Sequence, residues 1–511
     1  MINRRWHPAI ALIAGAGLVL SFSPTGYYPL AIVFPAILFY FWAKASSARA
    51  AWLGFLFGLG LFGAGASWVY VSIHEFGFMP APLAAILVFL FVVYLALFPA
   101  IAGWLQARFI QPGVYRLLFA APVFWVLMEW LRGWLMTGFP WLHLGYSQSN
   151  SPLMNLAPLT GVYGISLVVG ILAASSTLMV IGKGVHRLLA AALIGGVFIS
   201  SWAAGGMQFV EPAGPKVNIA LLQGNVALSE KWKPGASNQV ISHYAALSRN
   251  VVNNSAIIVW PEGAVPDNWQ HVSSWFGLSL PTREDGSMPD YLIGTIDSPA
   301  NGNYYNAAIS ISDKNKSTGS NGIYRKQHLV PFGEFLPFKP IFGWVIDYLK
   351  IPMSDFSSWQ GQQPDMKLAG WPVAVSICYE DAFGEELVQT VSGAAFLINI
   401  SEDAWFGNSL APHQRLQMAQ IRAREAGRYF VRAANTGVTA VINEKGEITS
   451  RLEQFVPSVL SSEVIPMKGL TPYVRFGNSL FLGMLMLWLL PVMVVRYRRK
   501  KSSKFQLSGS K

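Results

Sequence analysis

Cys378, Glu262 and Lys326 are the residues whose types and positions could together carry out nucleophilic catalysis. Cys378 is the only cysteine among 511 residues, and it directly follows the β-branched apolar run 373–377. Glu262 and Lys326 likewise lie at or just beyond apolar strands. If these strands are neighbours, Glu262 could take the thiol proton and Lys326 could stabilise an oxyanion, aided by the backbone N–H of Tyr379. The three side chains therefore predict covalent chemistry through a cysteine thiolate.

A structural alternative stays open when spacing alone is considered. A lone cysteine is usually a small buried hydrophobe, so Cys378 could be inert beside a buried Lys–Glu pair. One cysteine cannot form an internal disulfide or build a cysteine-based zinc or iron–sulfur site. The chain has no P-loop, no H-E-x-x-H motif and no G-x-G-x-x-G loop after a predicted strand, since its one string of that pattern (58–63) lies within an apolar run. Nucleotide-binding and zinc-peptidase functions therefore have little support.

The segment 206–473 has the composition of a folded extramembrane domain. Strands alternate with helices in its early part and pair as hairpins elsewhere. This order predicts a layered α/β sandwich that carries the three candidate residues at strand ends. The predicted strands are 217–226, 256–260, 291–297, 305–311, 373–379, 396–400 and 429–433, with helices at about 237–253 and 413–427 and a hairpin at 437–449.

Two long blocks outside this domain, about 1–205 and 474–496, are nearly free of charge. The whole chain is 53% hydrophobic and 12% charged, against roughly 25% charged in an ordinary soluble domain. A hydrocarbon core about 30 Å thick needs roughly 20 apolar residues per helix, so these blocks predict an α-helical transmembrane bundle of eight spans. The predicted spans are about 7–24, 28–43, 51–72, 82–106, 115–131, 158–181, 187–205 and 474–495.

Basic residues lie in alternate loops between these spans. Lys44 and Arg49 lie between the second and third, whereas the connection 73–81 has neither Lys nor Arg. Because cytoplasmic loops are enriched in these residues, both termini are predicted in the cytoplasm and the folded domain outside it. The same bias largely explains the formal net charge of +11, so we expect anionic lipid rather than nucleic acid as the partner. The predicted parts are a seven-span bundle (1–205), a periplasmic catalytic domain (206–473), an eighth span (474–495) and a basic cytoplasmic tail (496–511).

Three motifs give the chain a specific resemblance to a known superfamily. The sequences W-P-E ending at Glu262, Y-R-K-Q-H-L-V-P-F-G-E at 324–334 and I-C-Y-E-D at 377–381 resemble the Glu-Lys-Cys triad motifs of the nitrilase (carbon–nitrogen hydrolase) superfamily. Further motifs are similar to its membrane branch, the bacterial apolipoprotein N-acyltransferase family, and the resemblance covers nearly the whole chain. These motifs are Leu-Gln-Gly-Asn (222–225), Lys231-Trp232, Asp-Ala-Trp-Phe-Gly (403–407), Arg-Ala-Ala-Asn-Thr-Gly-Val (432–438) and a patch at 139–148.

The resemblance implies a nitrilase-like four-layer α-β-β-α sandwich and a role for each triad residue. It makes Glu262 the general base, Lys326 the oxyanion stabiliser and Cys378 the nucleophile. The supporting or substrate-binding residues that it implies are Glu334, which positions the lysine, Tyr379 and Glu380 beside the cysteine, Trp232 and Trp405.

Two of the surrounding residues keep a second interpretation. Trp232 could be a surface aromatic packed on a loop, and Glu380 could serve in ordinary capping or in a salt bridge. The chain also departs from the family pattern at Glu402, where asparagine is expected. The extra negative charge would alter the electrostatics near the site.

Apolar residues follow the proposed catalytic residues. The stretch 335–349 is rich in aromatic side chains, and Trp405 and Phe406 add more near the cysteine. A soluble enzyme with so much exposed aromatic surface would tend to aggregate, whereas a site against a bilayer could use it to hold acyl chains. We expect 335–355 to form a mobile lid at the outer leaflet; the alternative is that these side chains pack into the core.

Glu129, Arg132 and His143 are polar residues at or near a predicted membrane boundary. They could bind a phospholipid headgroup. Alternatively, Glu129 and Arg132 could pair with each other across one helical turn.

Together the residues and the resemblance predict a ping-pong N-acyltransferase in the bacterial inner membrane. Cys378 would take a fatty acyl group from a phospholipid as a thioester, and the α-amino group of an apolipoprotein's N-terminal diacylglyceryl-cysteine would then accept it. The expected partners are the phospholipid, the apolipoprotein and the bilayer, with no metal, organic cofactor or nucleic acid. Two alternatives remain: a membrane-tethered amidase or nitrilase acting on small carbon–nitrogen substrates, and a transporter or lipid-binding membrane protein.

Overall fold

The computed structural model describes residues 3–299, 302–314, 322–335, 355–479 and 481–487. It divides the chain into two compact units. Unit 1 comprises Met1–Ser67, Val88–Met207 and Phe476–Lys511, and unit 2 comprises Trp68–Leu87 and Gln208–Arg475. The predicted lid (335–355) lies almost entirely outside the described residues. So do the basic tail and the later part of the eighth predicted span.

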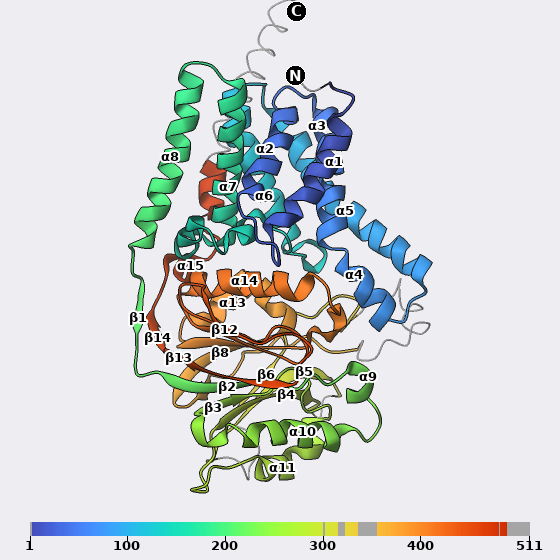
Figure 1. The fold of residues 1–511 in the computed structure, drawn as a ribbon, viewed down its shortest axis with the longest axis vertical. Coiled ribbons are helices and arrows are strands. Elements are labelled where there is room, and N and C mark those ends of the chain that lie inside the picture. Colours follow the sequence, from blue (N-terminus) through green and yellow to red (C-terminus); the bar gives the residue numbers. More distant parts are fainter. Residues whose placement is uncertain (1–2, 300–301, 315–321, 336–354, 480, 488–511) are drawn as a thin grey trace, which may run out of the picture. The chain divides into compact units, whose positions relative to one another are not determined.

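Unit 1 is helical (Figure 1). Among the described residues, four helical segments are long and apolar enough to cross a membrane: Ser47–Gly65, Ala81–Phe109, Pro152–Ile181 and Val185–Gly205. The first residues of the second segment belong to unit 2. The remaining predicted spans are shorter or are only partly described. The helices are α1 (His7–Leu18), α2 (Leu30–Trp42), α3 (Ser47–Gly65), α5 (Ala81–Phe109), α6 (Ala121–Arg132), α7 (Ala157–Ile181) and α8 (Val185–Gly205).

Two of the predicted spans differ from the helices found. The span predicted at 51–72 is too long, because α3 ends at Gly65 and the next short helix, α4 (Trp68–Val71), belongs to unit 2. The span predicted at 115–131 begins as a π-helical turn, Arg116–Ala120, before α6. Pro122 lies two residues beyond that turn, and proline has no N–H to donate to the hydrogen-bond ladder of a regular α-helix.

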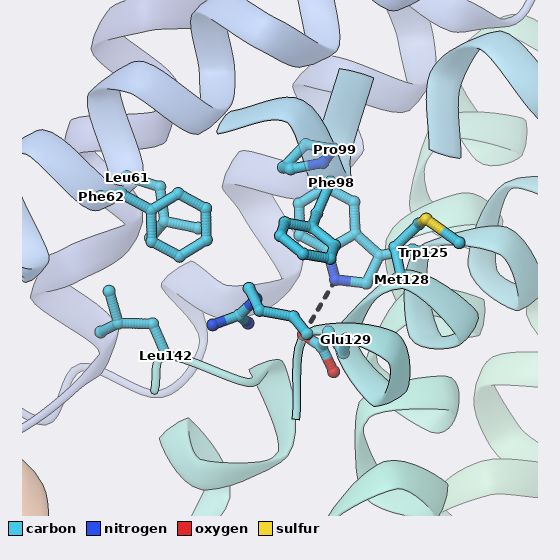
Figure 2. Close-up of a pocket in the computed structure, with 9 residues that line it drawn as sticks. Leu61, Phe62, Phe98, Pro99, Trp125, Met128, Glu129 and Leu142 are labelled. Atoms are coloured by element: carbon cyan, nitrogen blue, oxygen red, sulfur yellow. Dashed lines mark hydrogen bonds between the residues drawn. The ribbon is translucent and has the colours of Figure 1, made fainter. Parts of the chain in front are cut away.

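Glu129 and Arg132 on α6 bind the loop that follows this helix. Trp125 Nε1 and the Leu144 N–H both donate to Glu129 Oε1, at 3.0 and 2.8 Å. Arg132 Nη1 donates to the carbonyl oxygens of residues 139 and 141. Both side chains line the pocket in Figure 2, whose other walls are mostly apolar and where the Trp125–Glu129 bond is drawn as a dashed line. These bonds give both charged residues a structural role within unit 1.

Unit 2 contains two six-stranded sheets within the described residues (Figure 1). The strand orders are β13-β2-β3-β4-β5-β6 in one sheet and β12-β11-β10-β9-β8-β7 in the other, while β1 pairs with β14 separately. The bounds are β1 (Val210–Pro212), β2 (Val217–Gln223), β3 (Ile257–Val259), β4 (Asp290–Asp297), β5 (Tyr305–Ile311), β6 (Gly322–Arg325), β7 (Met366–Leu368), β8 (Trp371–Ile377), β9 (Phe396–Ser401), β10 (Phe430–Ala434), β11 (Ala440–Ile442), β12 (Ile448–Arg451), β13 (Ser458–Val464) and β14 (Met467–Gly469).

The two sheets pack face to face between helices. One apolar core joins β2 residues such as Leu221 to β8 residues such as Val375. A second core lies between β2 and helices α10 (Ser237–Arg249) and α11 (Trp269–Ser279), and a third involves β8 and helices α13 (Gly384–Val391) and α14 (Ala411–Ala426). Strands β2 and β8 are covered on both faces, which explains why most of their residues are apolar. Unit 2 is therefore layered helix, sheet, sheet, helix.

The strand order explains why polar residues meet at one edge. β2, β3 and β4 are mutually parallel neighbours, as are β8, β9 and β10. The carboxyl ends of parallel neighbours lie at the same edge of a sheet. Glu262 follows β3, Lys326 follows β6, Cys378 follows β8 and Asp403 follows β9.

Candidate active site

Cys378 sits at a strained turn from β8 into the 3₁₀ helix Cys378–Ala382. Its φ is +52°, a left-handed conformation that is uncommon for residues other than glycine. Such a conformation costs on the order of 1–3 kcal/mol and persists only where neighbours hold it. Asn399 Nδ2 and Arg415 Nη2 donate to the Cys378 carbonyl oxygen at 3.2 and 2.5 Å. The side chain is buried.

Lys326 is held by two carboxylates. Its ammonium nitrogen lies 2.7 Å from Glu334 Oε1 and 3.6 Å from Glu262 Oε1. Asn306 Nδ2 bridges the same two atoms, donating at 2.6 Å to Glu262 and 2.9 Å to Glu334. Burial lowers the pKa of Lys326, but Glu334, Glu262 and Cys378 raise it by more than burial lowers it. The net effect is a raised pKa, so the ammonium stays charged. A fixed buried cation of this kind can stabilise an oxyanion.

The second carboxylate oxygen of Glu262, Oε2, accepts a different hydrogen bond. The Glu402 N–H donates to Glu262 Oε2 at 2.7 Å. Both carboxylate oxygens are thus oriented by hydrogen-bond donors. Glu262 and Lys326 also act electrostatically on the Cys378 thiol, in opposite directions. The structure brings the predicted base, cation and nucleophile into one buried cluster.

The supporting residues occupy three different places. Glu380 accepts from the backbone N–H groups of Ile377 (2.6 Å) and Gln327 (2.7 Å) and from the hydroxyl of Tyr324 (2.9 Å). Glu380 therefore links the turn at Cys378 to the segment that follows Lys326. These bonds favour the interpretation of Glu380 as a capping residue. Tyr379 packs its ring edge-on against Phe383 at 5.0 Å.

Trp232 lies beside the segment that carries Glu262, the predicted base. A Cβ added at Gly263 would be 3.6 Å from Trp232 Cζ2 and 3.7 Å from Lys231 Nζ, so both side chains pack against the turn after Glu262. The buried indole nitrogen of Trp232 has no hydrogen-bond partner among the described residues. Trp405 lies on the loop 403–407, where its carbonyl oxygen accepts from Ser72 Oγ at 2.8 Å.

Two family models match this chain. The apolipoprotein N-acyltransferase N-terminal domain matches residues 14–175, and the carbon–nitrogen hydrolase domain matches 218–467. The apolipoprotein N-acyltransferase of Nitrosomonas europaea is 42% identical over 94% of this chain and 95% of the relative. This chain belongs to the apolipoprotein N-acyltransferase family. The enzymes of that name from Methylococcus capsulatus and Coxiella burnetii are 41% and 38% identical, over 97% and 94% of this chain and 97% and 98% of each relative.

Glu402, where this chain departs from the expected family pattern, has a buried partner of opposite charge. Its carboxylate forms a salt bridge with Lys231, and Asn435 Nδ2 donates to both of its oxygens. Burial raises the pKa of Glu402, whereas Lys231 lowers it. Lys231 Nζ also lies 3.4 Å from the Glu262 carbonyl oxygen. The negative charge of Glu402 is therefore balanced by Lys231, and this pair lies next to Glu262, the predicted base.

Breaking this pair on one side is expected to destabilise the protein. Lys231→Met leaves a buried carboxylate unpaired, and Glu402→Gln leaves a buried ammonium, so each should cost about 3–5 kcal/mol. The double variant has no unpaired charge and should unfold at a higher temperature than either single variant. Thermal unfolding of the three purified variants checks this, and a double variant less stable than both single variants would contradict it.

The thiol of Cys378 is expected to react slowly at neutral pH. Burial and the nearby Glu262 carboxylate raise its pKa to about 12, against the opposing effect of Arg415 and Lys326. Because the thiolate fraction falls tenfold for each pH unit below the pKa, alkylation by iodoacetamide should speed up about tenfold per unit from pH 7 to pH 10. Cys378 is the only cysteine, so mass spectrometry of the intact protein reports it directly. A plateau near pH 9 would contradict this expectation.

A cluster of four buried charged residues was not foreseen from the sequence. Arg415 and Arg432 both bind Asp381 and Asp403, at 2.6–2.9 Å in the shorter contacts. Burial raises the pKa of Asp403, but Arg432 and Arg415 outweigh it and lower that pKa. One feature of the sequence could have indicated this cluster: helix α14 has many polar residues among those that are buried. Buried polar side chains need polar partners.

Proposed function

We propose that this chain is an apolipoprotein N-acyltransferase that moves a fatty acyl group from a phospholipid to a lipoprotein. Family membership carries the proposal: the relatives bear this name and match nearly their whole length. The acceptor is the α-amino group of the N-terminal diacylglyceryl-cysteine, and the modification is the last step of lipoprotein maturation. The rival amidase activity is less well supported, because the N-terminal helical region also matches the acyltransferase family.

In the first half-reaction, Cys378 attacks an ester carbonyl of the phospholipid. Its sulfur forms a bond to the carbonyl carbon while its proton passes to Glu262. Since burial keeps the thiol neutral at rest, proton transfer and attack occur together. Lys326 stabilises the oxyanion, with the Tyr379 N–H as a second donor. The lysophospholipid leaves with the proton from Glu262, and an acyl thioester remains on Cys378.

In the second half-reaction, the lipoprotein amine attacks the thioester. Glu262 takes a proton from the amine as the nitrogen–carbon bond forms. The carbon–sulfur bond then breaks, and the departing sulfur recovers the proton. Glu334 and Asn306 fix the ammonium and the base for both steps. Splitting the transfer suits two bulky lipid substrates that need not occupy the site together.

The aromatic residues near the site would keep water from the thioester. Trp232 packs beside the turn after Glu262. The ring of Trp405 meets Phe76 edge-on, with centroids 6.2 Å apart. Excluding water protects a reactive acyl intermediate from hydrolysis. We assign both tryptophans to acyl-chain binding.

Substrate chemistry sets the location that we propose. Family membership and four long apolar helical segments make this a membrane protein. We place it in the bacterial inner membrane with eight spans, the domain 206–473 on the periplasmic side and both termini in the cytoplasm. The alternating basic loops support this orientation.

The test is intact-mass measurement of the purified full-length protein in detergent. After exposure to phospholipid, the mass should increase by one fatty acyl group, carried on Cys378. Adding a diacylglyceryl-cysteine peptide with a free amine should remove the increment and add the same mass to the peptide. An N-acetylated peptide is the matched control and should leave the acyl-enzyme intact.

Other results would contradict the proposal. Release of the acyl group as free fatty acid, with no gain in peptide mass, would indicate a hydrolase. Failure of the protein to gain mass, while the peptide is acylated, would exclude the thioester.

A further inference from the structure

Arg415 lies against the reacting atom of the proposed nucleophile. Its Nη1 donates to Cys378 Sγ at 3.5 Å, within the range for a hydrogen bond to sulfur. Its Nη2 donates to the carbonyl oxygen of the same residue at 2.5 Å. The guanidinium is fully buried on α14. A permanent positive charge on α14 thus lies next to the sulfur.

The guanidinium is held in place by two carboxylates. Nη1 lies 2.6 Å from Asp403 Oδ1, and Nη2 lies 2.9 Å from Asp381 Oδ2. Arg432 binds the same two carboxylates from the neighbouring strand β10, at 2.7 Å in each case. The two cations and two anions balance, so the cluster is neutral as a whole. Arg415 is therefore rigid and stays protonated, since burial lowers its pKa but Asp381, Cys378 and Asp403 raise it well above the usual range.

Negative charge on Cys378 sulfur needs such a partner. The buried thiol is surrounded by carboxylates, and Glu262 and Asp403 both disfavour the thiolate. Arg415 and Lys326 are the two cations that favour it most. Lys326 is bound to two carboxylates and is assigned to the oxyanion, so Arg415 is the cation with a hydrogen bond to the sulfur itself. Hydrogen bonds to an ionised group are roughly twice as strong as neutral ones.

We propose that Arg415 is a further catalytic residue, which stabilises the developing thiolate of Cys378 in both half-reactions. In the first, negative charge builds on sulfur as its proton moves to Glu262 and before the carbon–sulfur bond is complete. In the second, the carbon–sulfur bond breaks, its electron pair stays on sulfur, and Arg415 donates to that lone pair until Glu262 returns the proton. The acyl-transfer steps rest on the proposed function, whereas the effect on the sulfur does not.

A purely structural role for Arg415 has to be separated from this one. Its bonds to the Cys378 carbonyl, Asp381 and Asp403 also support the strained turn. Arg432 offers a matched control, because its replacement removes a cation from the same two carboxylates, those of Asp381 and Asp403. Within the described residues, its hydrogen bonds go to Asp381, Asp403 and Asn399.

The experiment measures alkylation of the single cysteine by iodoacetamide in the full-length protein between pH 7 and pH 10. Arg415→Gln should slow the reaction at least about tenfold at every pH, equivalent to one unit or more in the acidity of the thiol. Arg415→Lys, which keeps the charge, should recover most of the rate. Arg432→Gln should change the rate less than threefold, on the order of 0.6 kcal/mol or smaller. The unfolded proteins should all react alike, which controls for concentration and reagent.

The outcomes separate this inference from the proposed function. Arg415→Gln reacting as fast as the unmodified protein, or Arg432→Gln slowed equally, would overturn the role of Arg415. If Arg415→Gln does not fold, Arg415→Met and Arg432→Met replace the two Gln variants. Slower alkylation of Arg415→Met than of Arg432→Met is expected, and equal rates would overturn the role of Arg415. Acyl-enzyme formation from phospholipid is measured in parallel. An unmodified protein that forms none, while alkylation still depends on Arg415, would overturn the acyl-transfer proposal alone.

Discussion

Replacing Cys378 with alanine is expected to abolish acyl transfer, with a loss of at least about 10⁴-fold, as for removal of other covalent nucleophiles. The reason is that no other thiol exists in the chain to form a thioester. The fold should survive, because alanine is smaller and Cys378 is otherwise part of the apolar core between the sheets. Transfer to a lipopeptide is measured by mass spectrometry, with thermal unfolding as the check on folding.

Cys378→Ser is the control for this experiment. A serine hydroxyl is a far weaker nucleophile and has a much higher pKa than a thiol. The Cys378→Ser variant should accumulate no acyl-enzyme, and its acyl transfer should fall by a factor similar to that for Cys378→Ala. Substantial transfer by Cys378→Ala would show that the amine attacks the phospholipid directly and that the covalent mechanism is wrong.

Glu262→Gln is expected to lower the rate of both half-reactions by at least about 10³-fold, within the range for loss of a general base. The thiol of Cys378, with a pKa of about 12, cannot ionise appreciably at pH 8 without a base. The amide would also turn its NH₂ towards a donor, since both Glu262 oxygens accept hydrogen bonds from Asn306 and the Glu402 N–H. Single-turnover acylation and deacylation give the two rates separately.

Glu334→Gln is the matched control for the base. Glu334 shares Asn306 and Lys326 with Glu262, so its replacement removes the same kinds of bond near the same ammonium. It should lose no more than about a hundredfold, as a residue that positions the lysine. If the loss equals that of Glu262→Gln, the proton acceptor is not Glu262 alone.

The layered core of unit 2 could be predicted because its strands are buried on both faces. The predicted strands 291–297 and 305–311 match β4 (Asp290–Asp297) and β5 (Tyr305–Ile311) to within one residue. The strand predicted at 373–379 ends two residues earlier, because the chain turns at Cys378. Propensity could not reveal that turn, since a left-handed cysteine is held by contacts from other elements.

The charged environment of the site could be predicted only in part. Sequence motifs singled out Glu262, Lys326 and Cys378, and the structure places these three residues close together. Arg415, by contrast, reaches the sulfur from a helix 37 residues further along the chain. Lys231 and Glu402 are 171 residues apart, and the sequence pattern gave no reason to pair them. Such pairings depend on how the two sheets pack together, which the periodicity of the sequence does not encode.

Eight membrane spans were predicted, and four described helical segments are long and apolar enough to cross a membrane. The extent of one predicted span also differs from the helix found. Glycine-rich α3 was expected to continue to residue 72, because its hydropathy does. Instead, Trp68 packs its ring edge-on against Phe406 of unit 2, with centroids 5.0 Å apart. Tertiary packing thus ended an apolar run that hydropathy alone would extend.

Packing of Trp68–Leu87 within unit 2 has a practical consequence for anyone who dissects this enzyme. The polypeptide passes between the two units four times, at 67/68, 87/88, 207/208 and 475/476. A soluble fragment excised at residue 206 would lack the strip whose Ser72 hydroxyl and Trp68 ring support the loop 403–407. That loop carries Asp403, the anchor of Arg415. A fragment that begins at residue 206 would therefore lose contacts that help to hold the proposed active site in place.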